Sequence, residues 1–177
     1  MAAGVEVCQM GAKAGSKAAA PFPAQEHDHG HCATSAMDRA AAICTARGVR
    51  LTELRRRVLE LVWTSHRPVG AYDILAQLGG PDRPAGPPTV YRALDFLQEN
   101  GLVHRIASLN AYIGCPDPGH AFAPGIMICE ECGRAAELHD SAADNALSRA
   151  AAAAGFAITR RTIEMVGRCR DCAAQAA

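Results

Sequence analysis

Two Cys-x-x-Cys pairs in the last third of the chain constrain its fold more than any other feature. The first pair is Cys129 and Cys132, the second is Cys169 and Cys172, and residues 133–168 separate them. Four thiolates arranged in two such pairs form the closed tetrahedral site that is typical of structural Zn²⁺. The separation is longer than the roughly 15–20 residues of a common zinc ribbon, so we expect a small folded unit between the pairs. A redox role needs only one pair near a βαβ pattern, and the sequence favours structural zinc.

Length and charge set broad limits on the chain. Its 177 residues suit one ordinary domain or two small ones, and its formal net charge is zero. Residues 38–107 nevertheless hold ten arginines against seven acidic residues, a modest basic bias that is compatible with a phosphate-facing surface. We expect no membrane segment and no secretory signal, because no apolar run approaches about 20 residues and no apolar stretch follows the N-terminal lysines. Four of the eight cysteines stand in metal-type spacing, so a reducing, cytoplasmic location is predicted.

The first part of the chain lacks a periodic apolar pattern. Residues 1–36 are rich in Ala, Gly and Pro, and we predict a disordered tail. A short cluster within it, His27, His29, His31 and Cys32, is either a loose metal-binding tract or a flexible segment that happens to hold histidines.

Helical signals begin at Asp38. We expect a first helix over 38–44 with Cys44 buried, and a second from the N-cap Thr52 to Trp63. A third helix is predicted around Tyr72, Leu75 and Leu78, which share one face at helical spacing. The fourth is predicted to start at Pro88 with Thr89 as its cap. It buries Val90, Leu94 and Leu97, and leaves Tyr91, Arg92 and Asp95 pointing elsewhere.

Two short strands, 102–107 and 111–114, are expected to form a hairpin after the last of these helices. Helices followed by a hairpin are the layout of a winged helix-turn-helix, so residues 37–114 are predicted to be a DNA-binding domain. Its last helix would place its N-terminal residues in the major groove of double-stranded DNA.

The pattern changes after a connection at 115–123. Strands are expected at 126–128 and 135–139, an Ala-rich helix over 141–154, and a strand over 156–166. The predicted fold class is therefore α+β: an N-terminal winged helix, a hinge, and a small α/β domain over 124–177 that contains the four-cysteine zinc site. This unit is small and its helix offers little bulk for a private core, so we expect dimerisation through the sheet.

A second set of possible metal ligands lies at the joint between the two predicted domains: His104, Cys115, His120 and Glu137. The mixed nitrogen, sulfur and oxygen donors suit Zn²⁺, and the thiolate disfavours Mg²⁺ or Mn²⁺. A site in this place would join the domains only when metal is bound, which is what a sensor requires. The alternative is that His104 and Glu137 have ordinary structural or solvated roles. His139 is near enough in sequence to lend a further ligand.

The motifs resemble those of the ferric uptake regulator family, closest to its zinc uptake regulator branch. The resemblance rests on PPTVYRALDFLQENGLVHRI, ASLNAYIGC, ICEECG and CRDC, which occur in the family's order, and it covers about residues 38–172. It implies a homodimeric, zinc-responsive transcriptional repressor that binds A/T-rich palindromic operators near zinc-uptake genes. It also implies two zinc ions per chain, no catalytic activity, and no small organic substrate.

The resemblance assigns roles to individual residues. Cys129, Cys132, Cys169 and Cys172 match the structural zinc ligands, and His104, Cys115, His120 and Glu137 match the regulatory ones. Tyr72 and Arg92 match DNA-contacting positions, with Thr89 and Tyr91 beside them on the recognition helix. Iron-sensing members carry a His-rich stretch before the first cysteine pair, where this chain has His120 alone.

Three rival functions remain open from the sequence. Within the family, the rival is a sensor of iron, manganese or peroxide. Outside it, the rivals are a zinc-ribbon adaptor that binds protein rather than DNA, and a thiol oxidoreductase that uses one cysteine pair.

Overall fold

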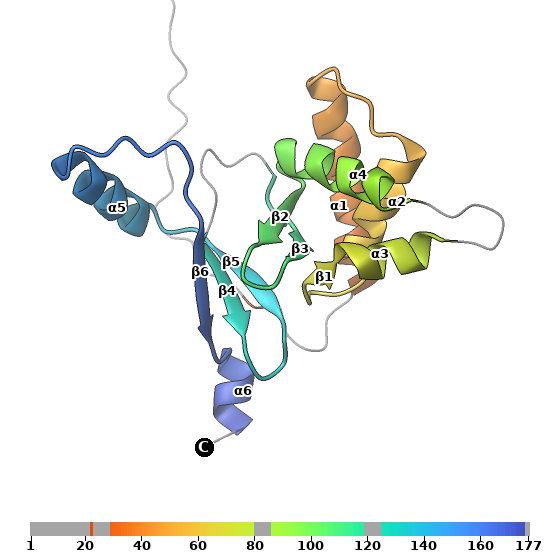
Figure 1. The fold of residues 1–177 in the computed structure, drawn as a ribbon. Helices are drawn as coiled ribbons and strands as arrows, with labels where there is room; N and C mark the ends of the chain where they lie inside the picture. Colours follow the sequence, from red (N-terminus) through yellow and green to blue (C-terminus); the bar gives the residue numbers. More distant parts are fainter. Residues whose placement is uncertain (1–21, 23–28, 80–85, 119–124, 176–177) are drawn as a thin grey trace, which may run out of the picture.

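The computed structural model describes residue 22 and residues 29–79, 86–118 and 125–175. Four helices and a three-stranded sheet form one part of the molecule, and a second three-stranded sheet with two helices forms the other (Figure 1). The elements of the first part are α1 (His29–Ala46), α2 (Glu53–Val62), β1 (Val69–Gly70), α3 (Ala71–Leu78), α4 (Pro87–Glu99), β2 (Val103–Ile106) and β3 (Ala111–Gly114). Those of the second part are β4 (Gly125–Cys129), β5 (Ala135–Leu138), α5 (Ser141–Ala153), β6 (Ile163–Gly167) and α6 (Arg170–Gln175).

Helix α1 begins earlier than expected. The sequence predicted a helix from Asp38, but α1 starts at His29, so residues 29–36 of the predicted tail are helical. Its inward face carries Ala36, Met37, Ala40 and Cys44, which are all buried against α2 and its neighbours. Small side chains at helical spacing let two helices approach closely, which explains how an Ala-rich segment contributes to a core. Residues 1–21 and 23–28 of the predicted tail, including His27, lie outside the described residues.

Helix α2 follows the sequence signals closely. The Thr52 hydroxyl accepts a hydrogen bond from the Arg55 amide at 3.5 Å, as expected of an N-cap. Four apolar residues at the inner face are buried: Val58, Leu59, Leu61 and Val62. The predicted burial of Cys44 in α1 is also confirmed.

Helix α3 packs through a different face from the predicted one. Ala71 and Ile74 are its buried residues, whereas Tyr72 is 69% exposed. Leu75 and Leu78 are half-buried against the core. The inward positions are thus 71, 74, 75 and 78, which follow the spacing of one helical face. Tyr72 stands one residue further round the helix, so the prediction that it shares one face with Leu75 and Leu78 is wrong.

Helix α4 starts one residue before the predicted start, at Pro87, with Gly86 as its N-cap. Thr89 lies in the first turn, where its amide donates to the Gly86 carbonyl at 2.9 Å, so the prediction of Thr89 as the cap is wrong. Proline at the first position explains the shift, because its fixed φ suits the helix and it lacks the N–H that a cap would satisfy. Val90, Leu94 and Leu97 are buried as predicted.

The hairpin of β2 and β3 is confirmed, with His104 opposite Ile113 and Ile106 opposite Ala111. Strand β1, which was not expected, adds to the free edge of β3 through the pairs Val69–Tyr112 and Gly70–Ala111. Two residues carry too little pattern for a strand to be recognised in the sequence.

In the second sheet, β4 lies between β5 and β6. It pairs antiparallel with β5 and parallel with β6, and α5 lies in the crossover between these two strands. The strand predicted over 156–166 is shorter in the structure, which has only Ile163–Gly167 as a strand. Residues 156–162 have no strand partner in the described chain; they connect α5 to β6. Helix α6, which holds Cys172, was not predicted.

The molecule has two apolar cores of unequal size. The larger joins α1–α4 with β2 and β3. The smaller consists of Ile106 and Ile113 of the hairpin together with Ile126, Ile128 and Ala135 of the second sheet. The second core therefore lies between the two parts and attaches the hairpin to the second sheet. No helix within the described ranges is long and apolar enough to cross a bilayer.

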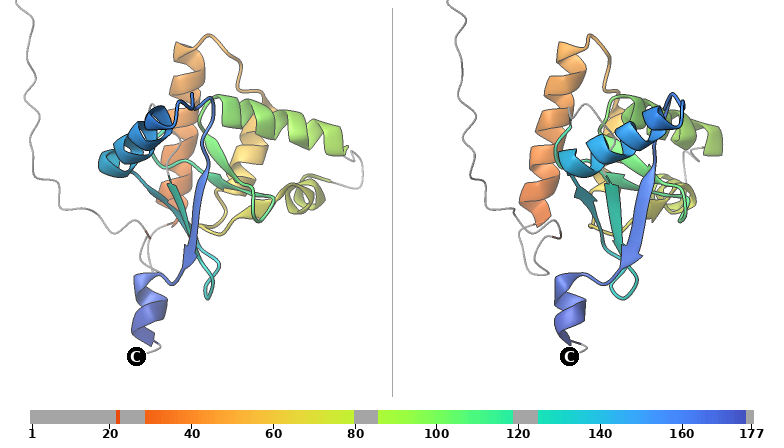
Figure 2. Two further views of the ribbon diagram at one scale, coloured as in Figure 1. Left: turned by 60° about the vertical axis from the view of Figure 1, so that its left-hand side comes forward. Right: turned by 90° about the vertical axis from the view of Figure 1, so that its left-hand side faces the viewer.

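Apolar side chains remain exposed on α5, on β6 and on the segment that joins them. Among the described residues, α5 has no buried side chain, and it projects away from the winged helix (Figures 1 and 2). Phe156 is 67% exposed and Val166 on the edge strand β6 is 66% exposed. Leu147, Ile158 and Met165 are exposed as well. One protomer thus leaves much of this apolar surface in contact with water.

Candidate metal centres and nucleic-acid interface

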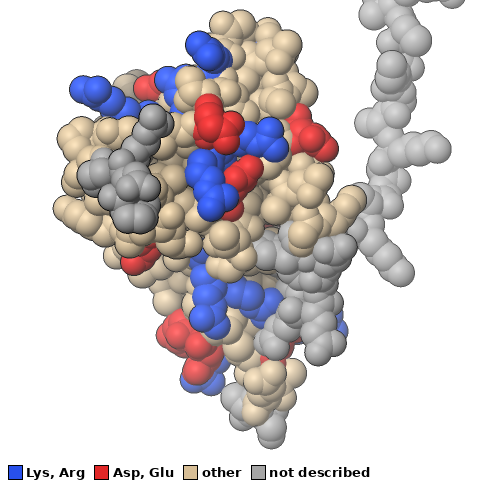
Figure 3. Space-filling model, turned by 90° about the vertical axis from the view of Figure 1, so that its right-hand side faces the viewer, with Lys and Arg blue, Asp and Glu red and all other residues tan. Residues whose placement is uncertain are grey.

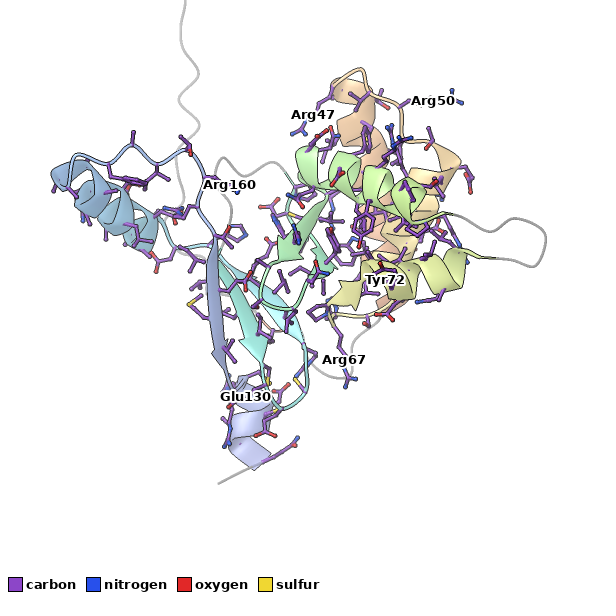
Figure 4. All side chains as sticks on the ribbon, in the orientation of Figure 1. Arg47, Arg50, Arg67, Tyr72, Glu130 and Arg160 are labelled. Carbon is purple, nitrogen blue, oxygen red and sulfur yellow. The ribbon has the colours of Figure 1, made fainter. Side chains whose placement is uncertain are left out.

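The first candidate metal centre, here called the four-cysteine cluster, lies at the end of the second sheet beside α6. Its candidate ligands are Cys129, Cys132, Cys169 and Cys172, whose sulfur atoms all lie within 4.8 Å of one another. Cys129 ends β4 and Cys172 lies in α6. Figure 4 shows Glu130, the neighbour of Cys129, at this end of the molecule. The structure therefore brings together all four cysteines of the two sequence pairs.

A tight turn explains how the first pair folds. Gly133 has φ +68°, a left-handed conformation that favours glycine, and its amide donates to the Cys129 carbonyl at 2.9 Å. The Cys129 amide donates to the Arg134 carbonyl at 2.9 Å, which closes the turn between β4 and β5. The second pair joins through the Cys169 amide, which donates to the Cys129 sulfur at 3.3 Å.

Backbone and arginine donors favour the charged form of two of these sulfurs. Amides of Cys132 and Cys169 lower the pKa of Cys129 to about 6. Burial opposes ionisation of Cys132, but the Arg134 guanidinium, which donates to its sulfur at 3.3 Å, holds its pKa below the usual range. Arg134 also donates to Cys169 at 3.5 Å and to Asp171 at 2.9 Å.

The fourth sulfur, that of Cys172, differs from these two because its charged form is disfavoured. Hydrogen bonding with Cys169 and burial raise the pKa of Cys172 to about 12, because a further thiolate among sulfurs this close is unfavourable. A divalent cation offsets that accumulated negative charge. Four sulfur donors suit Zn²⁺ in a closed tetrahedral site. The donor set of the four-cysteine cluster therefore fits zinc.

The second candidate centre, here called the joint cluster, lies between the two parts of the molecule. It consists of His104 on β2, Cys115 directly after β3, and Glu137 on β5, with ligand atoms within 4.8 Å of one another. His104 Nε2 lies 3.0 Å from Glu137 Oε1. Cys115 is 1% exposed and Glu137 is 8% exposed. His120, the fourth predicted ligand, lies outside the described residues.

Sheet register places these donors. The Cys115 amide donates to the Leu102 carbonyl at 3.0 Å, which holds Cys115 at the open end of the hairpin beside His104. Across the joint, Glu137 pairs with Ile126 in the second sheet, and Ile126 packs in the smaller core with Ile106 and Ile113 of the hairpin. The contacts that attach the hairpin to the sheet thus also bring the three donors together.

The charges within the joint cluster also fit a cation. Burial, together with the nearby Glu137 carboxylate, raises the pKa of the Cys115 thiol well above its usual range. Burial works against the charge on Glu137 too, but hydrogen bonds from His104 and His139 lower its pKa overall. A buried thiol beside a buried carboxylate and an imidazole is a donor set in which a divalent cation replaces the thiol proton. Nitrogen, sulfur and oxygen together suit Zn²⁺.

His139 contacts the joint cluster from the surface. Its Nε2 lies 2.9 Å from Glu137 Oε2, the oxygen that does not face His104. Partners of this kind orient a ligating carboxylate.

The predicted DNA-contacting residues lie on α3 and α4. Tyr72, Thr89 and Arg92 are exposed, whereas Tyr91 is half-buried and packs against the larger core. The structure thus leaves three of the four available to a partner at the surface. Figure 4 shows Tyr72 on α3, with Arg47 and Arg50 at the outer end of the winged helix.

Charges over the winged helix are mixed. In Figure 3, on the visible face of the described part of the chain, basic and acidic groups lie side by side rather than in one basic patch. Arg56 and Arg57 both contact Glu60, at 3.1 and 3.3 Å. Arg55 stacks over the Phe96 ring at 3.5 Å. These three arginines therefore have partners within the protein.

Two contacts were missed in the sequence. Arg134 is a donor to the four-cysteine cluster, and its only sequence signal is its place two residues after Cys132. Glu164 on β6 accepts hydrogen bonds from the hairpin turn, and nothing local in the sequence indicates it.

Comparison with known proteins gives concordant matches. A family model described as the ferric uptake regulator family matches residues 46–166. The chain is 40% identical to the zinc uptake regulation protein of Escherichia coli strain K12 over 137 residues, which cover 76% of this chain and 79% of that protein. It is 32% identical to the peroxide operon regulator of Bacillus subtilis strain 168 over 129 residues, or 71% of this chain and 85% of that one.

Solved structures agree with these matches. A zinc uptake regulator complexed with zinc and DNA has a TM-score of 0.75 and 36% identity, covering 82% of this chain and 98% of that chain. Holo XcZur has a TM-score of 0.72 and 39% identity, covering 79% of this chain and 98% of that chain. The family match runs from the end of α1 into β6 and so includes both the winged helix and the joint cluster. The chain belongs to the ferric uptake regulator family.

Proposed function

We propose that this protein is a zinc-responsive transcriptional repressor that binds A/T-rich palindromic operators as a homodimer and controls zinc-uptake genes. The observation that carries the proposal is the joint cluster: two donors from the hairpin and one from the second sheet lie within 4.8 Å of one another. The similarity to a zinc uptake regulator complexed with zinc and DNA supports the choice of metal and partner. The protein acts by binding, in the cytoplasm, and not by catalysis.

The proposal includes two zinc ions per chain. The four-cysteine cluster holds the structural ion, and His104, Cys115 and Glu137, completed by His120, hold the regulatory one. Zinc supplies a positive charge and a tetrahedral preference for nitrogen, sulfur and oxygen donors. With the three donors held together, the hairpin is fixed to the second sheet, and the orientation of α4 is fixed with it.

The proposal also divides the chain into two domains and a hinge. Residues 37–114 form the DNA-binding domain, 115–123 the hinge, and 124–177 the dimerisation domain. Helix α1 extends the first of these toward the N-terminus, because its residues from His29 belong to one helix. Cys115 stands at the start of the hinge, so a ligand at this position resists relative movement of the two domains.

Dimerisation would cover the exposed apolar surface of the second part of the molecule. The edge strand β6 has one neighbour, β4, and leaves its other side unpaired in the described protomer. An exposed edge beside Phe156, Ile158 and Val166 favours pairing with a second copy. Two winged helices are then presented to DNA by one rigid base, which a palindromic operator requires.

In the complex, α4 enters the major groove with its N-terminal half. Arg92 reaches a purine edge, Tyr72 packs on bases or thymine methyl groups, and Thr89 lies beside them. Tyr91 contributes chiefly by packing, since it is half-buried. Arg47 and Arg50 are exposed at the outer end of the winged helix and suit phosphate contacts.

Cys115 separates this proposal from its rivals within the family. A buried thiol in the joint cluster favours zinc over manganese, and to a lesser degree over iron. Resemblance to the peroxide operon regulator of Bacillus subtilis makes peroxide sensing the alternative to exclude. The zinc-ribbon adaptor leaves the exposed Arg92 at the start of α4 without a role, and mobility shift on DNA separates it from the repressor.

A mobility-shift titration tests the proposal. Full-length protein is titrated onto DNA from upstream of zinc-uptake genes, with zinc or with a zinc chelator, and with iron, manganese and peroxide in parallel. We expect tight binding with zinc, loss with chelator, and no effect of peroxide on the zinc-loaded protein. Arg92→Ala should weaken specific binding by about 1–3 kcal/mol, whereas Arg149→Ala on α5 should not. Binding that is equal with zinc and with chelator contradicts the proposal.

A further inference from the structure

A second contact between the hairpin and the second sheet involves no candidate metal ligand. Glu164 Oε1 on β6 accepts a hydrogen bond from the Ala107 amide at 2.6 Å, and Oε2 accepts one from the Ser108 amide at 3.1 Å. Ala107 and Ser108 form the turn between β2 and β3. The carboxylate thus connects the far end of the hairpin to the edge strand of the sheet.

The hairpin turn is shaped to receive a carboxylate. Asn110 adopts φ +46°, its amide donates to the Ala107 carbonyl at 3.2 Å, and its side chain accepts from Arg105 at 2.9 Å. These bonds hold the turn so that two successive amides point the same way, an arrangement that binds anions. Burial opposes the charge on Glu164, but hydrogen bonds from the Ser108 side chain and from the two amides outweigh it and lower the pKa of the carboxyl group.

The position of Glu164 in the sheet explains how its side chain reaches the hairpin. Ile126 of β4 pairs with Glu137 of β5 on one side and with Glu164 of β6 on the other. Side chains of directly paired residues lie on the same face of a sheet, so the three form one row that faces the hairpin. Glu137 contacts His104 near the hairpin's open end, Ile126 packs on Ile106 and Ile113, and Glu164 contacts the turn.

We propose that Glu164 is a positioning residue that anchors the hairpin turn to the dimerisation sheet independently of metal, so that the joint cluster sets the angle of the winged helix. One attachment leaves a domain free to swing about it, whereas two attachments at opposite ends of the hairpin define an orientation. Without Glu164, a filled joint cluster still ties the domains together but no longer fixes the separation of the two α4 helices in a dimer.

The contact itself is testable without DNA. Amide hydrogen exchange is measured on the full-length, zinc-loaded dimer for the wild type, Glu164→Ala, Glu164→Gln and the control Glu99→Gln. Glu99 is an exposed glutamate at the end of α4, so its substitution removes the same charge elsewhere. We expect exchange at Ala107 and Ser108 to rise about tenfold or more in Glu164→Ala, because a charge-assisted bond is lost. Glu164→Gln keeps one acceptor and should be intermediate, and Glu99→Gln should match the wild type.

The consequence for regulation rests on the proposed function and is measured separately. In the mobility-shift titration, Glu164→Ala should need about fivefold or more protein for half-saturation of the operator in zinc, within the usual range of coupling between sites. Its zinc content and dimer mass, from elemental analysis and sedimentation, should be unchanged. Unchanged exchange at Ala107 and Ser108 overturns the anchor. Raised exchange with unchanged operator affinity, in a wild type that binds, overturns the coupling. A wild type that ignores zinc contradicts the proposed function alone, since the exchange result still judges the anchor.

Discussion

The four-cysteine cluster and the joint cluster both offer donors that suit a zinc ion, but they connect different parts of the molecule. In the first, every donor comes from the second sheet and the segments that follow its strands, and Arg134 and backbone amides surround the sulfurs. In the second, two donors come from the hairpin and one from the sheet. A metal ion bound within one part of the molecule stabilises that part, whereas a metal ion bound between two parts controls how they are arranged.

The pKa values sharpen this difference. Amides and Arg134 already favour two thiolates in the four-cysteine cluster, with Cys129 at about 6. In the joint cluster, burial and Glu137 keep Cys115 protonated until a cation arrives. The first cluster therefore has two sulfurs prepared for a metal ion and one proton to lose at Cys172, whereas the Cys115 thiol of the second cluster must lose its proton against burial and a neighbouring carboxylate. Occupation of the joint cluster should be the weaker of the two and the one that responds to free zinc.

The largest expected effect comes from breaking the four-cysteine cluster with Cys129→Ser. Loss of a structural metal belongs to the changes that cost about 4 kcal/mol or more, which lowers the melting temperature by about 8–16 °C for a chain of this size. Calorimetry and elemental analysis should show a lower melting temperature and loss of the retained zinc, and sedimentation should show loss of the dimer. Cys44→Ser, at a buried cysteine outside both clusters, is the matched control. A zinc-containing, stable Cys129→Ser dimer contradicts the structural role.

Breaking the joint cluster with Cys115→Ser should leave the fold and abolish the response. The variant should remain a dimer with one tightly held zinc per chain, measured by elemental analysis after dialysis. Zinc-dependent operator binding should fall by more than about 100-fold, since loss of a ligand exceeds the 10–100-fold cost of losing an outer partner. Normal repression by this variant would falsify the assignment of the regulatory site. Cys44→Ser again controls for the change of sulfur to oxygen.

His139→Ala tests the boundary of the joint cluster. If His139 orients Glu137, zinc affinity at the joint cluster should fall by about tenfold, the lower end expected for an outer partner, because the imidazole is partly exposed. X-ray absorption of the zinc-loaded protein should then show the same number of nitrogen ligands as in the wild type. A missing nitrogen ligand means that His139 binds the metal itself.

Arg134→Lys should have the smallest effect. A lysine retains the charge but not the planar fork that reaches Cys132, Cys169 and Asp171 together. Loss of one such bond costs about 1 kcal/mol, so release of the structural zinc to a chelator should be roughly fivefold faster. Arg168→Lys is the control, because Arg168 contacts Glu130 and Glu131 and no cysteine. Equal release rates in the two variants would show that Arg134 does not help the four-cysteine cluster to retain its metal.

Local patterns in the sequence predicted the parts of the molecule that local forces determine. The cysteine spacing indicated a zinc cluster whose four sulfurs the structure brings together, and the N-cap Thr52 and the hairpin strands were found near their observed bounds. Cys115, Glu137 and His104 were grouped from their order along the chain, and the structure places these three within reach of one ion. Their role as ligands remains a prediction, as does that of His120.

Features that depend on distant contacts were not predictable in the same way. Tyr72 was grouped on one face with Leu75 and Leu78 because their spacing fits a helix, but Ala71 and Ile74 are the buried residues of α3. An Ala-rich α1 carries little hydrophobic pattern, so its start at His29 went unseen. Glu164 meets a turn more than fifty residues earlier in the chain, and no periodicity records such a partner.

The packing of Trp63 against Gly114 gives the molecule an optical property. Trp63 is the single tryptophan of the chain, and a Cβ built on Gly114, the residue before Cys115, would overlap its indole ring. The indole also lines a pocket of about 100 Å³ with His66 and Glu137. The fluorescence of Trp63 therefore comes from the contact between the winged helix and the second sheet. The emission wavelength and the fluorescence lifetime of this tryptophan should therefore report, in real time and without an added label, how the winged helix docks on the second sheet.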